Sequence, residues 1–90
     1  MNSPSFAAFY FPPVTGGPET PRFGFTTPRA LGKAVIRNRI RRRIREAVRH
    51  EQHRFPAGAA IVFNPRKSAL DVPFEALRQE VIKVAVRCSK

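Results

Sequence analysis

The sequence of 90 residues is poor in cysteine, in acidic residues and in long apolar runs. Its one cysteine, Cys88, excludes an internal disulfide framework and fits a reducing compartment such as the cytoplasm. The uncharged residues 1–15 contain three prolines and no basic start, so neither a signal peptide nor a membrane-spanning helix is predicted. Glycine-rich phosphate loops, serine elbows and zinc motifs are also missing, so we do not expect catalysis by this chain alone.

Basic residues, in contrast, are abundant and unevenly placed. The chain has 17 Lys and Arg against 6 Asp and Glu, a formal net charge of +11, on a length sufficient for a single domain, residues 1–90. Residues 29–54 hold ten of these bases and only two of the acids, and nearly all ten are arginine. A guanidinium group binds phosphate oxygens in pairs and stacks on bases, so this segment predicts a nucleic acid as partner.

The order of local patterns predicts an α+β fold, with helices packed on a small β-sheet. The change from alternating to helical periodicity gives the order β-β-α-β-α, and the first two strands, joined by a Gly- and Pro-rich loop, suggest an antiparallel hairpin. The predicted strands are residues 5–11, 22–27 and 59–63, and the predicted helices are residues 34–50 and a segment that starts near Asp71 and Pro73.

The first predicted helix carries the charge. Its apolar residues recur with a period of 3.6 and form one stripe, while the opposite side is almost entirely cationic. Pairs of arginines four residues apart destabilise an isolated helix by a few tenths of a kcal/mol each, and such repulsion indicates an external polyanion that neutralises it. The stripe consists of Ile36, Ile40, Ile44, Ala47 and Val48.

The centre of this helix contains the motif Arg37-Asn38-Arg39, followed by further basic pairs and by Arg45-Glu46. The motif follows a strand with the sequence Phe23-Gly24-Phe25-Thr26 and a glycine, Gly32. This arrangement resembles the signature of the protein subunit of bacterial ribonuclease P. The resemblance covers about 80 residues in layout, and residues 23–46 in motif detail.

The resemblance implies a non-catalytic subunit of an endoribonuclease. Such proteins bind the catalytic RNA of ribonuclease P and precursor tRNA in the cytoplasm and assist removal of the 5′ leader, while the RNA performs the hydrolysis with magnesium ions. It further implies that the protein alone binds no cofactor and no metal, contacts no membrane, and is a monomer without RNA. Together with the charge pattern, it gives these candidate RNA-binding residues: Arg29, Lys33, Arg37, Asn38, Arg39, Arg41, Arg42, Arg45 and Arg49.

The resemblance also implies a left-handed crossover through helix 34–50, as in the second domain of ribosomal protein S5, and a cleft on the sheet that holds the leader. The candidate cleft residues are Phe9, which stands where a tyrosine is usual, with Ala7 and Phe11 on the same face. In members of the family, an N-terminal helix forms one wall of this cleft. This sequence is expected to lack that helix. Pro28, Ala30 and Lys33 also depart from the common Ser, Lys and Asn.

Two other functions and several structural roles remain open from the residues alone. A general assistant of RNA folding would bind many RNAs alike, and a DNA-binding module would place helix 34–50 in the major groove. Phe6, Phe23 and Phe25 are expected to pack within the sheet, whereas Phe9 and Phe11 are candidates for stacking single-stranded bases. His50 and His53 lack the neighbours of a metal site. Acidic residues Asp71, Glu75 and Glu80 are assigned to the start and outer face of the last helix.

Overall fold

The computed structural model describes residues 1–13, 16–17 and 19–89 and confirms the α+β class and the predicted order of elements. The strands are β1 (Phe6–Phe11), β2 (Arg22–Phe25) and β3 (Ala60–Pro65), and the helices are α1 (Ala34–Glu51) and α2 (Phe74–Cys88). Three short 3₁₀ segments connect them: η1 (Arg29–Leu31), η2 (Gln52–Arg54) and η3 (Lys67–Leu70).

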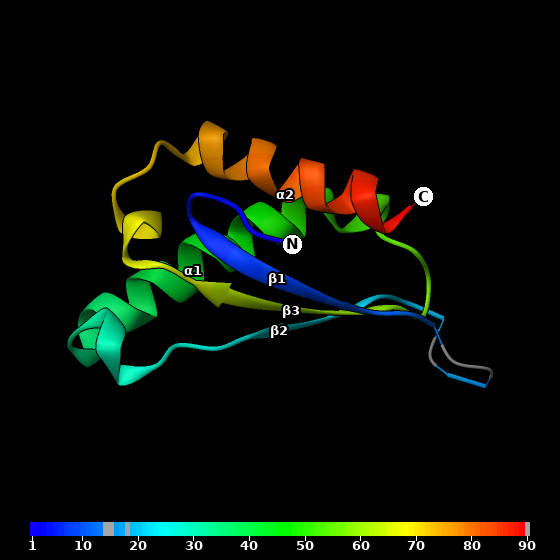
Figure 1. The fold of residues 1–90 in the computed structure, drawn as a ribbon, viewed down its shortest axis with the longest axis horizontal. Coiled ribbons are helices and arrows are strands. Elements are labelled where there is room, and N and C mark those ends of the chain that lie inside the picture. Colours follow the sequence, from blue (N-terminus) through cyan, green and yellow to red (C-terminus); the bar gives the residue numbers. More distant parts are fainter. Residues whose placement is uncertain (14–15, 18, 90) are drawn as a thin grey trace.

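The sheet has β3 at its centre, so the predicted hairpin of the first two strands is wrong. β1 pairs with β3 in antiparallel orientation, and β2 pairs with β3 in parallel orientation on the other side (Figure 1). The apolar β3 takes the central place because pairing on both sides satisfies its backbone groups away from water. Helix α1 provides the crossover that a parallel β2–β3 pair requires. The handedness of this crossover stays a prediction.

Both helices lie on one side of the sheet, and the hydrophobic core fills the space between the two layers (Figure 1). Alternate residues of each strand point into this core, as the period of two demands. Complete burial of a large aliphatic or aromatic side chain contributes about 1.5–3 kcal/mol relative to exposure. The large side chains buried here include Phe6, Ile61 and Phe63 from the sheet, Ile40 and Ile44 from α1, and Leu77 and Val81 from α2.

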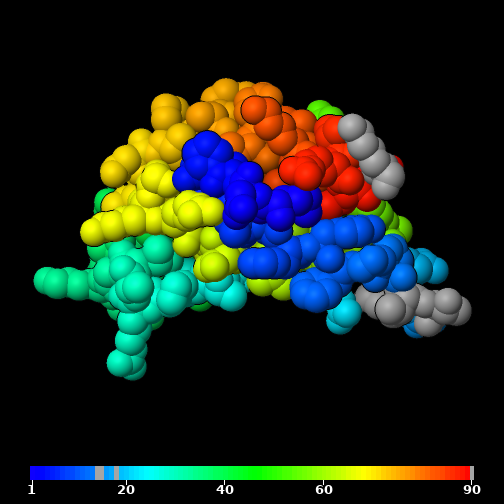
Figure 2. Space-filling model, viewed as in Figure 1, coloured from blue at the N-terminus to red at the C-terminus, as the bar shows by residue number. Residues whose placement is uncertain are grey.

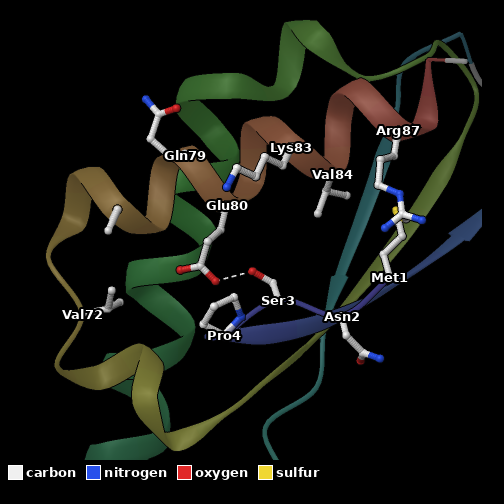
Figure 3. A pocket seen from close by; sticks show the side chains of 11 residues that line it. Met1, Asn2, Ser3, Pro4, Val72, Gln79, Glu80, Lys83, Val84 and Arg87 are labelled. Carbon is white, nitrogen blue, oxygen red and sulfur yellow. Dashed lines mark hydrogen bonds between the residues drawn. The ribbon is translucent and has the colours of Figure 1, made fainter.

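The first five residues fold back along β1 and rest against α2 (Figure 3). The carboxylate of Glu80 accepts hydrogen bonds from the Ser5 amide at 2.8 Å and the Ser5 hydroxyl at 2.7 Å, and it also contacts the Ser3 hydroxyl. The assignment of Glu80 to the outer face of the last helix is therefore wrong. Ser5 is buried, so its amide and hydroxyl need an acceptor, and Glu80 supplies it.

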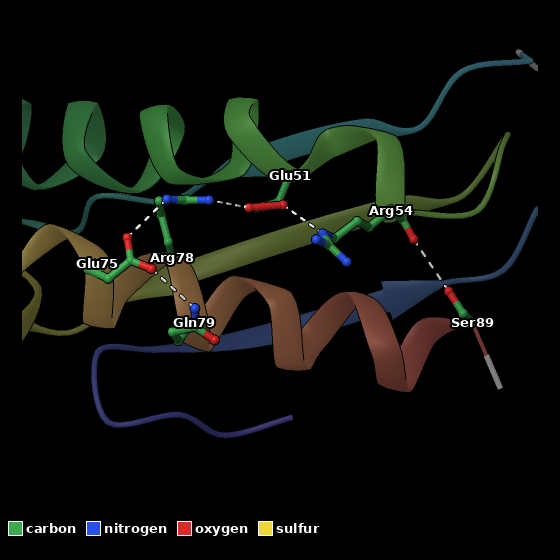
Figure 4. Close-up of polar contacts among 6 residues, drawn as sticks. All are labelled: Glu51, Arg54, Glu75, Arg78, Gln79 and Ser89. Carbon is green, nitrogen blue, oxygen red and sulfur yellow. Dashed lines mark hydrogen bonds and ion pairs between the residues drawn. The ribbon is translucent and has the colours of Figure 1, made fainter.

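A group of charged residues joins the end of α1 to α2 (Figure 4). Glu51 is only 2% exposed, and its two carboxylate oxygens accept hydrogen bonds from Arg78 at 2.9 Å and Arg54 at 2.7 Å. These bonds, from Arg78 first and then Arg54, lower the pKa of Glu51 below its ordinary value of 4.5. Arg78 also donates to Glu75 at 2.9 Å, so one arginine connects two carboxylates.

Neither helix is long and apolar enough to cross a membrane, within the residues described. Cys88 lies in the core, and burial raises the pKa of its thiol, as expected for a structural cysteine and not for a nucleophile.

Candidate nucleic-acid interface

The predicted apolar stripe of α1 faces the core, and the cationic side faces outward. Ile40, Ile44, Ala47 and Val48 are buried, and Ile36 is half-buried. Because these residues fix the rotation of the helix about its axis, most of the arginines are held away from the protein. The exposed candidates are Asn38, Arg39, Arg42, Arg45 and Arg49, and Arg37 and Arg41 are half-buried. We call these seven residues the arginine face.

Arg43 is different from its neighbours and serves the fold. Its guanidinium donates hydrogen bonds to the carbonyl oxygens of Ala69 at 2.8 Å and Leu70 at 2.6 Å, and it also bonds the carbonyl of Val72. Ala69 and Leu70 end η3, and Val72 lies between η3 and α2, so Arg43 holds the segment that positions α2 against α1. The candidate list omits Arg43, in agreement with this structural role.

Two polar details describe how the arginine face is held. The Nε of Arg37 is buried yet makes no hydrogen bond within the described residues. Its exposed neighbours on the helix, Arg39 and Arg42, are the guanidinium groups that an external phosphate can reach. Asn38 accepts a hydrogen bond from Arg41 at 3.2 Å, which fixes that guanidinium beside the helix.

The start of α1 adds a further positive region. Arg29 and Lys33 are exposed on the segment that leads into the helix, and the first turn of α1 contains no acidic residue. Unpaired N–H groups at a helix start carry a partial positive charge that attracts anions. Gly32, with φ at 129°, allows the sharp entry into α1. Long side chains of the cyan and green part of the chain project from this end of the molecule (Figure 2).

The open face of the sheet carries the predicted cleft residues. Phe9 and Phe11 are 51% and 53% exposed and lie with the half-buried Ala7 on the face opposite the core. Phe9 is paired with Val62 of β3, which is in turn paired with Gly24 of β2. A Cβ atom at Gly24 would lie 3.5 Å from the Val62 side chain, so the glycine leaves the β2 edge of this face without a side chain beside Val62.

The other aromatic residues pack as predicted. The ring of Phe63 contacts Phe6 edge to face, with 5.2 Å between centroids, and stacks on Phe25 at 5.7 Å. Phe23 contacts Phe55 edge to face at 5.1 Å. Such pairs contribute about 0.5–1.5 kcal/mol beyond the burial of their area.

Three residues that sequence reasoning did not propose as functional lie beside α1 or at the segment that leads into η3. Arg66 and Lys67 are exposed directly after β3, and η3 packs against α1. Two adjacent bases after a buried strand were the only available signal for them. Phe74, the first residue of α2, contacts His50 of α1 at 5.9 Å between ring centroids. No pattern in the sequence links these two rings, because 24 positions separate them.

No cluster of three or more His, Cys, Asp or Glu side chains suited to a metal ion occurs among the described residues. The candidate residues brought to the surface are cations, an amide and aromatic rings, a combination suited to phosphates and bases.

Comparison with known proteins decides the family. The family model described as Ribonuclease P matches residues 1–89. This chain belongs to the ribonuclease P protein family. The ribonuclease P protein component of Symbiobacterium thermophilum is 55% identical over 60 residues, which are 67% of this chain and 52% of that protein. The component from Brucella suis is 44% identical over 64 residues, covering 70% of this chain and 45% of that protein.

Solved structures agree in fold. The ribonuclease P protein of Thermotoga maritima superimposes with a TM-score of 0.81 at 27% identity, covering 97% of this chain and 80% of that one. The Staphylococcus aureus protein, at 22% identity and a TM-score of 0.75, supports the fold alone; the match covers 100% of this chain and 79% of that one. The chain spans about half the length of the curated relatives named above.

Proposed function

We propose that this chain acts as the protein subunit of ribonuclease P in the cytoplasm, binding the catalytic RNA and precursor tRNA. In this function the RNA hydrolyses the phosphodiester bond with its magnesium ions, and the protein contributes affinity and stabilises the active RNA fold. The observation that supports it best is the arginine face, a row of guanidinium groups held outward by the buried isoleucine edge of the same helix.

The arginine face suits a phosphate backbone better than base edges. Its exposed arginines make no ion pair with an acid among the described residues, so their charges are available to an external anion. A protein that contacts about six to eight phosphates loses roughly 10³-fold or more in affinity between 50 and 200 mM salt. We expect this protein to show such a dependence with the ribonuclease P RNA of the same genome.

Reconstitution tests the proposal directly. The protein is added to that RNA at low magnesium, and removal of the 5′ leader from a precursor tRNA is measured. We expect strong stimulation of cleavage, and an RNA that cleaves equally well with and without the protein would refute the function. A general assistant of RNA folding would bind unrelated structured RNAs equally well, and a DNA-binding module would prefer duplex DNA in competition at 150 mM salt.

A pair of matched variants tests the interface. The double variant Arg37→Ala/Arg39→Ala removes two cations from the arginine face and should lower the slope of log affinity against log salt by about two. The control Lys83→Ala/Arg87→Ala removes the same charge from exposed positions of α2 and should leave the slope nearly unchanged. Equal slopes in the two variants would mean that α1 is not the contact surface.

The exposed aromatic residues of β1 supply a second surface, which we assign to the 5′ leader of precursor tRNA. Single-stranded bases stack on exposed rings, and Phe9 and Phe11 offer two such rings on one face of the sheet. This surface is separate from the arginine face, so binding of leader and of catalytic RNA can be measured independently.

A further inference from the structure

The edge of α1 that faces the start of α2 differs chemically from the rest of the arginine face. Here the exposed part of the helix carries a carboxylate, Glu46, whose Oε1 lies 3.4 Å from Nε2 of His50. The ring of His50 in turn contacts the half-buried ring of Phe74 edge to face, with an angle of 72° between the ring planes. An acid, an imidazole and an aromatic ring thus lie together beside a row of arginines.

A shallow groove in two neighbouring parts lies along this edge. One part, of about 430 Å³, is lined by Arg42, Arg43, Arg45, Glu46 and Phe74. The adjoining part, of about 340 Å³, extends toward the first turn of α1. The two parts share Arg42 and Arg43, so we treat them as one and call it the Phe74 groove. The residues of the second part are Val35, Asn38, Arg39, Arg42 and Arg43.

The groove has a fixed base and free cations at its rim. The guanidinium of Arg43 is held by the carbonyl oxygens that precede α2, so it does not move to meet a ligand. Arg39 and Arg42 are exposed, and neither makes a hydrogen bond or ion pair within the described part of the chain. A phosphate would therefore bind at Arg39 and Arg42, which lie three positions apart on α1, within one helical turn.

The other end of the groove suits a base and not a phosphate. The carboxylate of Glu46 repels phosphate but accepts hydrogen bonds from amino and imino groups of a base. Phe74 offers an aromatic ring on which a base can stack. An acidic peptide would bring its carboxylates against Glu46, and so the observed chemistry favours a nucleotide.

We propose that the Phe74 groove binds one unpaired nucleotide of the RNA subunit, with its base on Phe74 and Glu46 and its flanking phosphates on Arg39 and Arg42. The inference rests on the proposed function, because it takes the RNA subunit as the ligand. The Phe74 groove would thus recognise a base, whereas the arginine face recognises only the phosphate backbone.

Substitution of the aromatic ring tests the stacking contact. Phe74→Leu in the full chain should weaken binding to the ribonuclease P RNA of the same genome by about tenfold, with an unchanged salt slope because no phosphate contact is lost. Phe74→Trp should retain the affinity. The control Phe23→Leu removes another half-buried ring, from the core side of the sheet, and should bind like the parent protein.

Replacement of Glu46 distinguishes a hydrogen bond to a base from a purely electrostatic effect on RNA binding. Glu46→Ala raises the net charge by one, so electrostatics alone predicts tighter RNA binding. If Glu46 accepts a hydrogen bond from a base, the same variant binds several-fold more weakly. Tighter binding by Glu46→Ala would overturn the proposal.

Cross-linking gives a measurement that does not depend on the stability of a variant. A benzophenone amino acid at position 74 of the assembled complex should cross-link to a single-stranded nucleotide of the RNA subunit. Absence of an RNA cross-link at position 74, or a cross-link in cells to a protein instead, would refute the inference. If the parent protein binds and stimulates the RNA while Phe74→Leu binds equally well, only this inference fails. If the parent protein does not bind, the proposed function fails.

Discussion

The guanidinium of Arg43 lies 2.6 Å from the carbonyl oxygen of Leu70, whereas Arg42 and Arg45 on the same helix are exposed. Adjacent arginines of one basic run therefore have separate roles. Arg43 fixes the start of α2, and Arg42 one position earlier is exposed. The difference follows from the rotation of about 100° per residue, which turns Arg43 toward η3 and Arg42 away from it.

Alanine at these two positions should separate stability from RNA binding. Arg43→Ala removes hydrogen bonds from a charged donor, so we expect a loss of about 1.5–3 kcal/mol in the free energy of unfolding. For a domain of this size each kcal/mol corresponds to a decrease of about 4–8 °C in Tm. Arg42→Ala should keep the Tm and weaken RNA binding. Thermal unfolding by circular dichroism and RNA titration measure the two effects, and identical profiles for the two variants would contradict the assignment.

Acid should destabilise the protein through Glu51. The pKa of Glu51 is lowered in the folded state by Arg78 and Arg54, so the ionised carboxylate stabilises the fold. This contribution is fully present above the ordinary pKa of 4.5 and is lost as the pH falls through the lower pKa of the folded state. Glu51→Gln should be less stable at pH 7 and show a flatter loss of stability below pH 4.5. The control Glu19→Gln, at an exposed position, should follow the parent curve in urea unfolding at each pH.

The bond between Glu80 and Ser5 should protect the start of the chain from hydrogen exchange. In Glu80→Ala the buried Ser5 amide has no acceptor, which costs about 1–3 kcal/mol. We expect faster exchange of the Ser5 amide and a lower Tm. Lys83→Ala, an exposed position one turn later on α2, should change neither quantity. Unchanged exchange at Ser5 in Glu80→Ala would show that the contact does not hold the segment in solution.

Loss of the exposed ring of Phe9 should affect the substrate and not the RNA subunit. With the RNA complex assembled, Phe9→Ala should weaken binding of a precursor tRNA by a factor that corresponds to about 1–3 kcal/mol, the value of one base stack. Mature tRNA, which has no leader, should bind the variant and the parent complex equally. A comparable loss for both tRNAs would place the defect outside the leader surface.

The helices and the buried strand could be predicted because their signals are local. The periodic isoleucines give both the length of α1 and its buried side, and the apolar run before Pro65 gives the central strand. The strand pairing could not be predicted in this way. β1 and β2 are neighbours in sequence, but each gains more by pairing with the apolar β3 than with the other.

The site shows the same division between local and distant signals. The spacing of residues on one helix predicts which arginines are exposed, and the list of RNA contacts drawn from it stays a prediction. The roles of Glu80 and Phe74 depend on residues far away in sequence, Ser5 and His50, so a pattern within a short window contains no sign of them.

The central place of β3 has a consequence for synthesis on the ribosome. In the described structure β1 and β2 each pair with β3, whose residues emerge after both strands and the whole of α1 have left the exit tunnel. Until then the nascent chain contains two unpaired strands and a helix of mutually repelling arginines. The sheet forms only through pairing between residues distant in sequence, and such contacts form slowly. The positively charged helix is thus made before β3 and α2, the elements against which it packs.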